Sequence, residues 1–211
     1  MKLLSQTFTD GAAVPQRCAF CAPADAQPPL TMSDNRNPHL AWSEVPAGTL
    51  SFALVCCDPD VPSVGDDVNQ AGRRVPSSLP RVDFYHWLLW NIPADVLEIA
   101  EATCSDGVTA RGKSGPKAKG STAHGLNDYT GWFAEDPDMT GDYYGYDGPC
   151  PPWNDERLHH YVFTIYALDV ESLSLGEAVT GAQLLDVIEP HIVGQASMTG
   201  TYTLNPSLLS A

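Results

Sequence analysis

The stretch HHYVFTIYALDV, residues 159–170, constrains the fold of this chain more than any other feature. Its β-branched and aromatic residues predict a strand. Alternate side chains of a strand point to opposite sides, and here both sides are apolar. One side carries Tyr161, Phe163 and Ile165, and the other carries Val162, Tyr166 and Leu168. A strand without a polar face must be covered on both sides, so we expect it in the interior of a sheet.

Three other stretches are enriched in the same residue types and are also predicted as strands: residues 50–57, 83–92 and 197–205. Helix signals are fewer. Thr180 and Gln183 have the spacing of a capping box, at the start of a helix that Pro190 is expected to kink or end. Pro93 at a first helical position predicts a second, brief helix. The fold class is therefore mostly β with short peripheral helices.

Length and charge limit the classes of protein to which the chain can belong. Its 211 residues suffice for one sizeable core, and no change of composition marks a boundary, so residues 1–211 are predicted as a single domain. The 26 acidic residues against 11 basic ones give a formal charge of −15, which disfavours nucleic acid and anionic membrane surfaces as partners. No apolar run has the length of a signal peptide or a membrane span, so we expect a cytoplasmic protein without integral membrane association.

The six cysteines are too few per residue for a disulfide scaffold, and without a secretion signal we expect them to be reduced. The spacing of Cys18 and Cys21 leaves a zinc or redox site as an alternative, but neither a second CxxC nor an HxxxH supplies further ligands. We therefore interpret both as small buried or loop residues and predict no metal site. Cys56 and Cys57 are consecutive in an apolar stretch, so they should face opposite sides of a strand as core residues.

Two long stretches rich in Gly, Pro, Asp and Ser, residues 58–82 and 102–158, separate the predicted strands. Loops of this length are uncommon in a compact domain unless they are functional or packed on themselves. The second stretch has six aromatic residues within 127–148, which are too many for a solvated linker. We expect it to form an ordered cover over one end of the sheet.

Polar residues gather at the ends of the predicted strands, where binding sites are commonly built. Asp58 and Asp60 follow the first strand, while His86, His159 and Tyr161 belong to the other two. If the strands are neighbours, these side chains offer imidazole and phenol donors beside a carboxylate, a set that holds a small oxyanion. The charge of Asp58 would raise the pKa of a neighbouring imidazole, and a protonated ring donates to phosphate more strongly. We therefore expect phosphate affinity to fall as that ring loses its proton.

Simpler interpretations of the same residues stay open. Asp58 in a DPD sequence is equally consistent with a side chain that caps its own turn, and His86 with a satisfied core histidine. Because side chains alternate, His160 is predicted to point away from any pocket that His159 enters. The sequence GPCPP, residues 148–152, restricts φ at three prolines and predicts a rigid wall.

The ordered motifs DPDVPS, HWLLWNIP, GLNDYTGW, YYGYDGPCPP and HHYVFTIYALD resemble the phosphatidylethanolamine-binding protein family, in its bacterial branch of Raf-kinase-inhibitor-like proteins. The resemblance extends over residues 37–205. It implies two antiparallel sheets packed as a Greek-key sandwich, short helices at the carboxyl end, and an exposed pocket for phosphate or a phosphorylated head group. The pocket residues that it implies are Asp58, Asp60, His86, Gly148, Pro149, Cys150, Pro151, His159 and Tyr161.

The resemblance is incomplete in two places. The carboxyl-terminal tyrosine that lines the pocket in mammalian relatives has no secure match here. The insertion at residues 63–84 is longer than in those relatives and resembles a bacterial subgroup. Access to the pocket is therefore expected to differ from theirs.

Three functions are compatible with these residues. The first is a non-catalytic module that binds a small anion or phosphorylated ligand without a metal or cofactor. The second is a hydrolase that uses the same acids and histidines on a metal or in acid-base chemistry, although no G-x-S-x-G or HExxH motif is present. The third is a regulator of a kinase or protease, whose target the resemblance does not specify. We predict the first, combined with regulation of a partner protein; the oligomeric state stays open, with a homodimer as one alternative.

Overall fold

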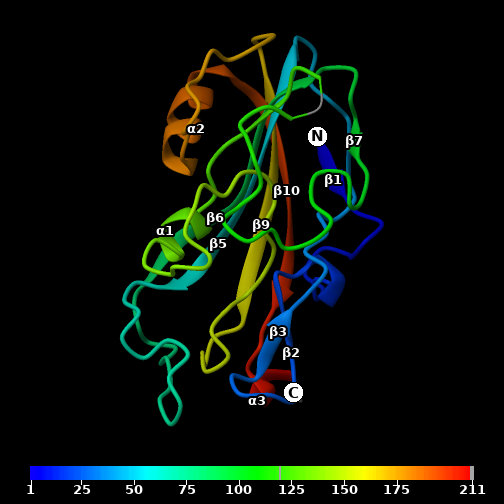
Figure 1. The fold of residues 1–211 in the computed structure, drawn as a ribbon. Coiled ribbons are helices and arrows are strands. Elements are labelled where there is room, and N and C mark those ends of the chain that lie inside the picture. The colour runs from blue at the N-terminus through cyan, green and yellow to red at the C-terminus, as the bar shows by residue number, and fades with distance from the viewer. Residues whose placement is uncertain (119, 210–211) are drawn as a thin grey trace.

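The computed structural model describes residues 1–118 and 120–209 and is built around an antiparallel sheet with the strand order β10, β9, β5, β6, β8 (Figure 1). Three long strands form its centre, and a long and a very short strand form its edges. They are β5 (Ser51–Pro62), β6 (Arg81–Pro93), β9 (His159–Leu168), β10 (Ile192–Tyr202) and β8 (Ala123–His124). The predicted mostly β class is confirmed.

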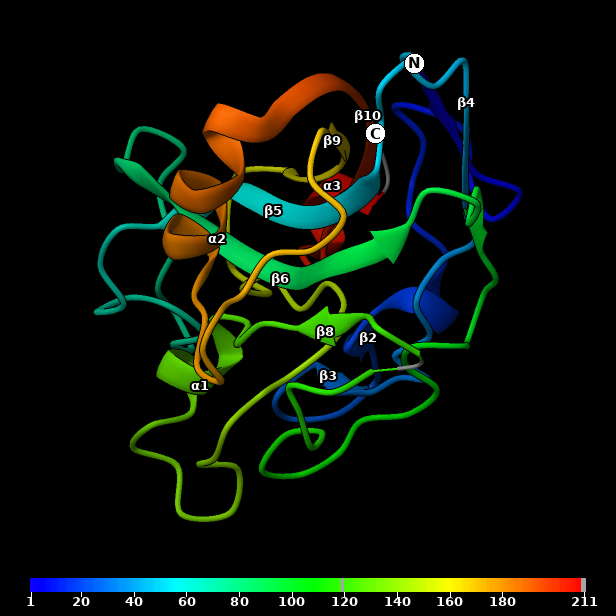
Figure 2. The same ribbon diagram turned by 90° about the horizontal axis from the view of Figure 1, so that it is seen from above.

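Smaller elements cover the two faces of this sheet. On one face lie a three-stranded sheet and a hairpin, whose buried residues form one apolar core with the large sheet. Their strands are β1 (Lys2–Leu4), β4 (Leu40–Ser43) and β7 (Glu98–Ile99), and β2 (Cys21–Pro23) with β3 (Leu30–Met32). On the other face α2 (Gly181–Ile188) packs Leu184 and Ile188 against the sheet (Figure 2). The arrangement is the predicted sandwich of antiparallel sheets, and α2 lies in the carboxyl-terminal part of the chain, as predicted.

The predicted central strand is β9, and it is central. β10 pairs with it on one side and β5 on the other. Its two faces contribute to different cores, with Phe163 and Ile165 on the side of the smaller sheet and Leu168 on the side of α2. The absence of a polar face in its sequence therefore corresponds to burial on both sides.

The carboxyl-terminal elements agree with the prediction in type and differ in their bounds. α2 begins with the predicted capping box, in which Thr180 accepts from the Gln183 backbone and the Gln183 side chain accepts from the Thr180 backbone. The α-helix ends at Ile188 and continues as a 3-10 turn, η2 (Glu189–His191), which contains Pro190. The chain enters β10 directly after this turn, so that strand begins earlier than residue 197 and ends at Tyr202.

The brief helix predicted after Pro93 is wrong. Pro93 is the last residue of β6 and pairs with Ser51 of β5, and a turn follows in which the Val96 N–H donates to the Pro93 carbonyl. The chain then forms β7, whose Ile99 pairs with Leu40 of β4. Pairing with two sheets overrides the local helix signal, because a segment this short gains little from helical hydrogen bonds.

The second long irregular stretch forms an ordered cover in its described residues, 102–118 and 120–158, as predicted. It contains β8 and α1 (Tyr129–Trp132), and its aromatic residues Tyr129, Tyr143 and Tyr146 are buried in the core of the smaller sheet. The remaining short elements are η1 (Gln16–Cys18) and α3 (Pro206–Leu209). Among the helices of the described residues, none is long and apolar enough to span a membrane.

Candidate functional site

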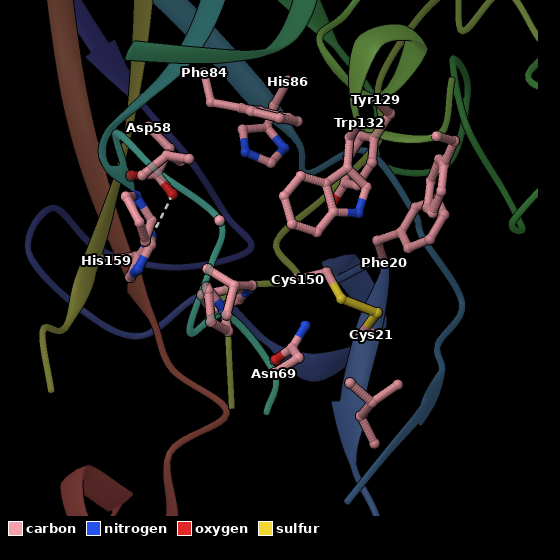
Figure 3. Close-up of a pocket in the computed structure, with 18 of the residues that line it drawn as sticks. Phe20, Cys21, Asp58, Asn69, Phe84, His86, Tyr129, Trp132, Cys150 and His159 are labelled. Carbon is pink, nitrogen blue, oxygen red and sulfur yellow. Dashed lines mark hydrogen bonds and ion pairs between the residues drawn. A yellow bond between two sulfur atoms is a disulfide. The ribbon is translucent and has the colours of Figure 1, made fainter. Parts of the chain in front are cut away.

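A cavity of about 270 Å³ lies where the predicted polar residues converge (Figure 3). Asp58 of β5, His86 of β6, and His159 and Tyr161 of β9 all line it. They come together because β5 pairs with both β6 and β9. In Figure 3, Asp58 and His159 lie together on one side of the cavity, with Trp132 of α1 across from them.

Asp58 has two buried partners. Its Oδ1 accepts a hydrogen bond from the Asp60 N–H at 2.8 Å, and its Oδ2 lies 2.7 Å from Nδ1 of His159. The register of β5 with β6 shifts between Asp58 and Val61, at the position of Pro59. Asp58 therefore stabilises its own turn, as the simpler interpretation holds, and also contacts an imidazole.

His159 lies between two carboxylates. Its Nε2 is 3.1 Å from Oδ2 of Asp155, and Asp155 also accepts two bonds from the guanidinium of Arg81. Burial acts to lower the pKa of His159, but the hydrogen bonds to Asp155 and Asp58 outweigh burial and raise this pKa to about 9. The ring is an imidazolium at neutral pH, and both of its N–H groups are used within the protein. Asp58 thus raises the pKa of an imidazole as expected, but this ring has no N–H left for a ligand.

His86 is the second imidazole of the cavity, and its environment is different. Its side chain is buried, and Nδ1 donates to the Asp147 carbonyl at 2.8 Å. That carbonyl is held in place, because the Asp147 carboxylate accepts bonds from Lys113, Asn35 and Asn127. Burial lowers the pKa of His86, so the ring is neutral at pH 7. In a neutral ring with its proton on Nδ1, Nε2 is an acceptor, and it is the nitrogen left for a ligand.

Tyr161 contributes a hydroxyl to the same cavity. Its side chain is only 1% exposed, and within residues 1–118 and 120–209 its Oη has no hydrogen-bond partner. Burial and the charge of Asp58 raise the pKa of Tyr161 well above its ordinary value, so the hydroxyl keeps its proton. Its ring meets His86 edge-on with centroids 5.1 Å apart. An unpartnered buried hydroxyl loses the hydrogen bonds it makes to water, which a ligand oxygen would restore.

The other walls of the cavity are mainly apolar. Phe20 stacks on Tyr129 with ring centroids 4.6 Å apart. At the rim, Met32, Val64 and Trp132 are each about half exposed. The remaining apolar lining residues are Leu30, Val61, Pro62, Val68, Phe84, Phe133, Pro151 and Pro152.

The glycine-proline wall contributes to the cavity with only part of its length. Cys150 and Pro151 line the cavity, whereas Gly148 and Pro149 lie outside its lining, as far as the described residues define it. The Pro149 carbonyl accepts hydrogen bonds from the N–H groups of residues 20 and 21. The wall is thus tied to the start of β2, and Gly148 and Pro149 support the cavity from behind.

Gly148 is the position where the wall tolerates no side chain. A Cβ there would lie 2.1 Å from the Cys18 carbonyl oxygen. Because that atom is backbone, relief requires a shift of the chain, and we expect Gly148→Ala to lower the free energy of unfolding by about 2 kcal/mol in urea denaturation. Gly176→Ala is the matched control, since a Cβ there meets nothing within 4 Å. Equal stability of the two variants would contradict the close packing of the wall.

Asp60 lies beside the cavity and not in it. Its Oδ2 is 2.7 Å from Nδ1 of His160, and its Oδ1 is 3.2 Å from Arg157. The His160 side chain is about half exposed, which confirms that it points away from the pocket that His159 enters. The structure therefore places the buried Asp60 carboxylate in ion pairs with His160 and Arg157, outside the lining of the cavity.

The expectation that all cysteines are reduced is wrong for one pair. Cys21 and Cys150 form a disulfide at the edge of the cavity, with Cα atoms 4.8 Å apart. Their 129-residue separation hides the pairing from the sequence, because only the packing of β2 on the wall brings them together. Cys18 is a free buried thiol, as interpreted, and burial raises its pKa to about 12. Cys56 and Cys57 face opposite cores, as predicted.

Comparison with known proteins assigns the chain to a family. The sequence model of the phosphatidylethanolamine-binding proteins matches residues 4–203. This chain belongs to the phosphatidylethanolamine-binding protein family. The match confirms the resemblance of the motifs and includes every residue discussed above as part of the cavity.

Known proteins of similar sequence match almost the whole chain. The UPF0098 protein YbhB of Escherichia coli is 30% identical over 203 residues, which cover 96% of this chain and 100% of YbhB. A UPF0098 protein of Chlamydia pneumoniae is 32% identical over 202 residues, which cover 96% of this chain and 98% of that protein. The crystal structure of E. coli YbcL, described as a member of the mammalian PEBP family, superposes with a TM-score of 0.67 at 25% identity over 96% of this chain and 97% of YbcL.

Several residues of this phosphatidylethanolamine-binding protein site were not found by sequence reasoning. Asp155 contacts the His159 ring opposite Asp58, and Arg81 holds Asp155; we call these contacts the clamp on His159. Tyr129 and Trp132 form part of the cavity walls. Tyr129 and Trp132 lie in the stretch predicted as an ordered cover, and the aromatic content of that stretch was a signal that could have identified them. Asp155 lies in a Pro-rich loop and Arg81 is the first residue of β6. A buried ion pair between two such positions has no sequence signature.

Proposed function

We propose that this member of the family is a non-catalytic binding protein for a small anion, in particular a phosphorylated ligand. One observation carries the proposal: polar atoms of Asp58, His86 and Tyr161 meet in a cavity whose other walls are mainly apolar. Small-molecule sites commonly combine an apolar enclosure with a few convergent polar groups that orient the ligand. The buried Tyr161 hydroxyl supplies a donor for a ligand oxygen.

The distribution of charge favours a small anion over a polyanion. The formal charge of −15 repels nucleic acid at long range. Near the cavity, however, Asp58 and Asp155 are paired with His159 and Arg81. Two carboxylates and two cations leave the floor of the cavity close to neutral, so the local cost of admitting one small anion is low.

The walls of the cavity favour an anion that carries an organic substituent. Met32, Val64 and Trp132 at the rim expose apolar surface directly beside the polar floor. Such surface gains about 25 cal/mol for each Å² that a substituent buries. Exposed apolar surface at the mouth also offers a contact for a partner protein, so regulation of a kinase or protease through the occupied pocket is part of the proposal.

The geometry gives a hydrolase less support. A histidine that acts as a general base needs a free nitrogen lone pair, and both nitrogens of His159 are engaged by carboxylates. His86 Nδ1 bonds a backbone carbonyl and not a carboxylate, so the ring lacks the charged partner that strengthens a catalytic histidine. Among the described residues, no group of three or more His, Cys, Asp or Glu side chains is arranged to hold a metal ion.

Phosphate affinity is expected to fall as the pH rises from about 5.5 to about 8. Burial lowers the pKa of His86, so the free ring is neutral at pH 7. A bound anion favours the protonated ring and therefore raises the pKa of His86 in the complex, with uptake of a proton. Between these two pKa values, each unit of pH lowers the affinity by up to about tenfold.

Calorimetric titration with inorganic phosphate, in buffers of different ionisation enthalpy, measures both the affinity and the proton uptake. Phosphate itself titrates in this range, so His86→Gln reports the part of the pH dependence that does not come from the ring. His160→Gln is the matched control, since it changes a half-exposed histidine outside the cavity and should leave the profile unchanged. A wild-type affinity that stays constant over the range would contradict the proposed role of His86.

A further inference from the structure

The disulfide between Cys21 and Cys150 lies in the wall of the cavity and joins two parts of that wall (Figure 3). Cys21 is the first residue of β2, and Cys150 belongs to the glycine-proline wall. All six cysteines lie in the described part of the chain, and the other four are free thiols. One bond beside four thiols is not the pattern of a disulfide scaffold, in which bonded cysteines are dense. The bond therefore needs a separate explanation.

The bond holds a hairpin that has few other attachments. In the described residues, β2 and β3 form a two-stranded sheet of their own. Its base is fixed, because the N–H groups of Phe20 and Cys21 both donate to the Pro149 carbonyl. Beyond that base the hairpin carries Leu30 and Met32, which line the cavity. A two-stranded hairpin is marginally stable by itself in water, so the disulfide is the covalent link that holds this part of the rim against the wall.

The position of the bond makes it accessible from the cavity. Both cysteines line the cavity, and Cys150 is partly exposed whereas Cys21 is only 3% exposed. The rate of thiol–disulfide exchange depends on access to the sulfur that is attacked. A thiolate that enters the cavity therefore reaches Cys150 first, and Cys21 is the leaving group.

The CxxC spacing of Cys18 and Cys21 does not supply a second redox partner. Cys18 is fully buried, and burial raises the pKa of its thiol to about 12, so it carries almost no thiolate at neutral pH. Cys56 is also fully buried, and burial raises its pKa well above the ordinary value. Because the thiolate is the species that attacks a disulfide, an external thiol is needed to open the bond.

We propose that the Cys21–Cys150 disulfide is a redox-active site that small dithiols reduce through the cavity, and that its reduction releases the β2–β3 hairpin from the wall. A thiolate of the dithiol attacks Sγ of Cys150, which forms a mixed disulfide and displaces the Cys21 thiolate. The second thiolate of the dithiol then displaces the Cys150 thiolate, and the two protein thiolates take up the protons that the dithiol has lost. Two electrons pass to the protein, and the dithiol leaves as its own disulfide. The state of the bond thus sets how rigidly Leu30 and Met32 are held at the cavity, whichever ligand occupies it.

Treatment of the native protein with dithiothreitol, followed by alkylation with iodoacetamide and mass spectrometry, tests the reduction. Cys21 and Cys150 are expected to be labelled at a rate that is proportional to the dithiothreitol concentration and nearly independent of urea below the unfolding transition. Cys56 is the internal control, because its side chain is fully buried and should react only after unfolding. Labelling of Cys21 and Cys150 only together with Cys56 would show that global unfolding opens the bond, and would overturn the proposal.

Hydrogen exchange followed by mass spectrometry tests the release of the hairpin. Reduction is expected to speed exchange in residues 20–33 at least about tenfold and to leave β9 unchanged. Cys21→Ser should show the same fast exchange without a reductant. Cys104→Ser is the matched control, since it removes a partly buried free thiol outside the lining of the cavity. If Cys21→Ser does not fold, the reduced wild type provides the test, and equal exchange in the oxidised and reduced wild type would overturn the release.

Discussion

Replacing His86 by alanine is expected to weaken phosphate binding by roughly ten- to hundredfold, because a hydrogen bond to a charged group contributes about 1.5–3 kcal/mol. The fold should persist, since the side chain lost has one hydrogen bond, to the Asp147 carbonyl, and lies at the wall of an existing cavity. Asp58→Ala is expected to abolish phosphate binding, a larger effect than that of His86→Ala. It also leaves the buried His159 with one carboxylate instead of two, so this variant should be less stable than His86→Ala.

Calorimetric titration with inorganic phosphate measures the affinity of each variant, and circular dichroism establishes that it is folded. His191→Ala is the control for removal of a histidine, because His191 lies in η2, pairs with Asp169 and is not part of the cavity. Unchanged affinity in either folded cavity variant would remove Asp58 or His86 from the site.

The clamp on His159 is expected to make stability depend on pH. The pKa of His159 is about 9 in the folded chain against an ordinary value of 6.5. The clamp therefore stabilises the fold fully below pH 6.5, and this contribution is lost as the pH rises through about 9. Since one pKa unit corresponds to about 1.4 kcal/mol, the loss is about 3 kcal/mol.

Urea denaturation of the wild type and His159→Gln, at pH values between about 6 and about 10, isolates this effect. Buried thiols with raised pKa values, such as Cys57, also destabilise the fold in alkali, but they do so equally in both proteins. The difference in free energy of unfolding should therefore shrink by about 3 kcal/mol over this range. The free energy of unfolding of His160→Gln should change with pH in the same way as that of the wild type. A difference between wild type and His159→Gln that stays constant with pH would contradict the clamp.

The two cavity histidines thus have separate roles. His159 is charged and holds β9, β5 and the loop with Asp155 together, while His86 is neutral and keeps a nitrogen for a ligand. Both are buried side chains in strands that flank β5 in the same sheet, so their burial does not explain the difference. It comes from their partners, which are two carboxylates for one ring and a backbone carbonyl for the other. A partner's charge decides whether a buried imidazole keeps its proton.

The sequence by itself determined the features that depend on local pattern. The apolar faces of residues 159–170 identify a central strand, the capping box identifies the start of α2, and alternation separates His159 from His160. The motifs identify the family and bring Asp58, His86 and Tyr161 into one site. These predictions succeed because side-chain alternation and helix capping act between residues a few positions apart.

Only the tertiary structure decided which polar atoms are left for a ligand. The disulfide of Cys21 with Cys150, the pairing of Asp155 with His159 and Arg81, and the exclusion of Asp60 from the cavity all join or separate segments through packing. The turn after Pro93 was decided in the same way, by strand pairing that outweighs a weak local helix signal. Hydrogen bonds between distant segments have no sequence period, and they determine the charge and the free lone pairs of buried groups.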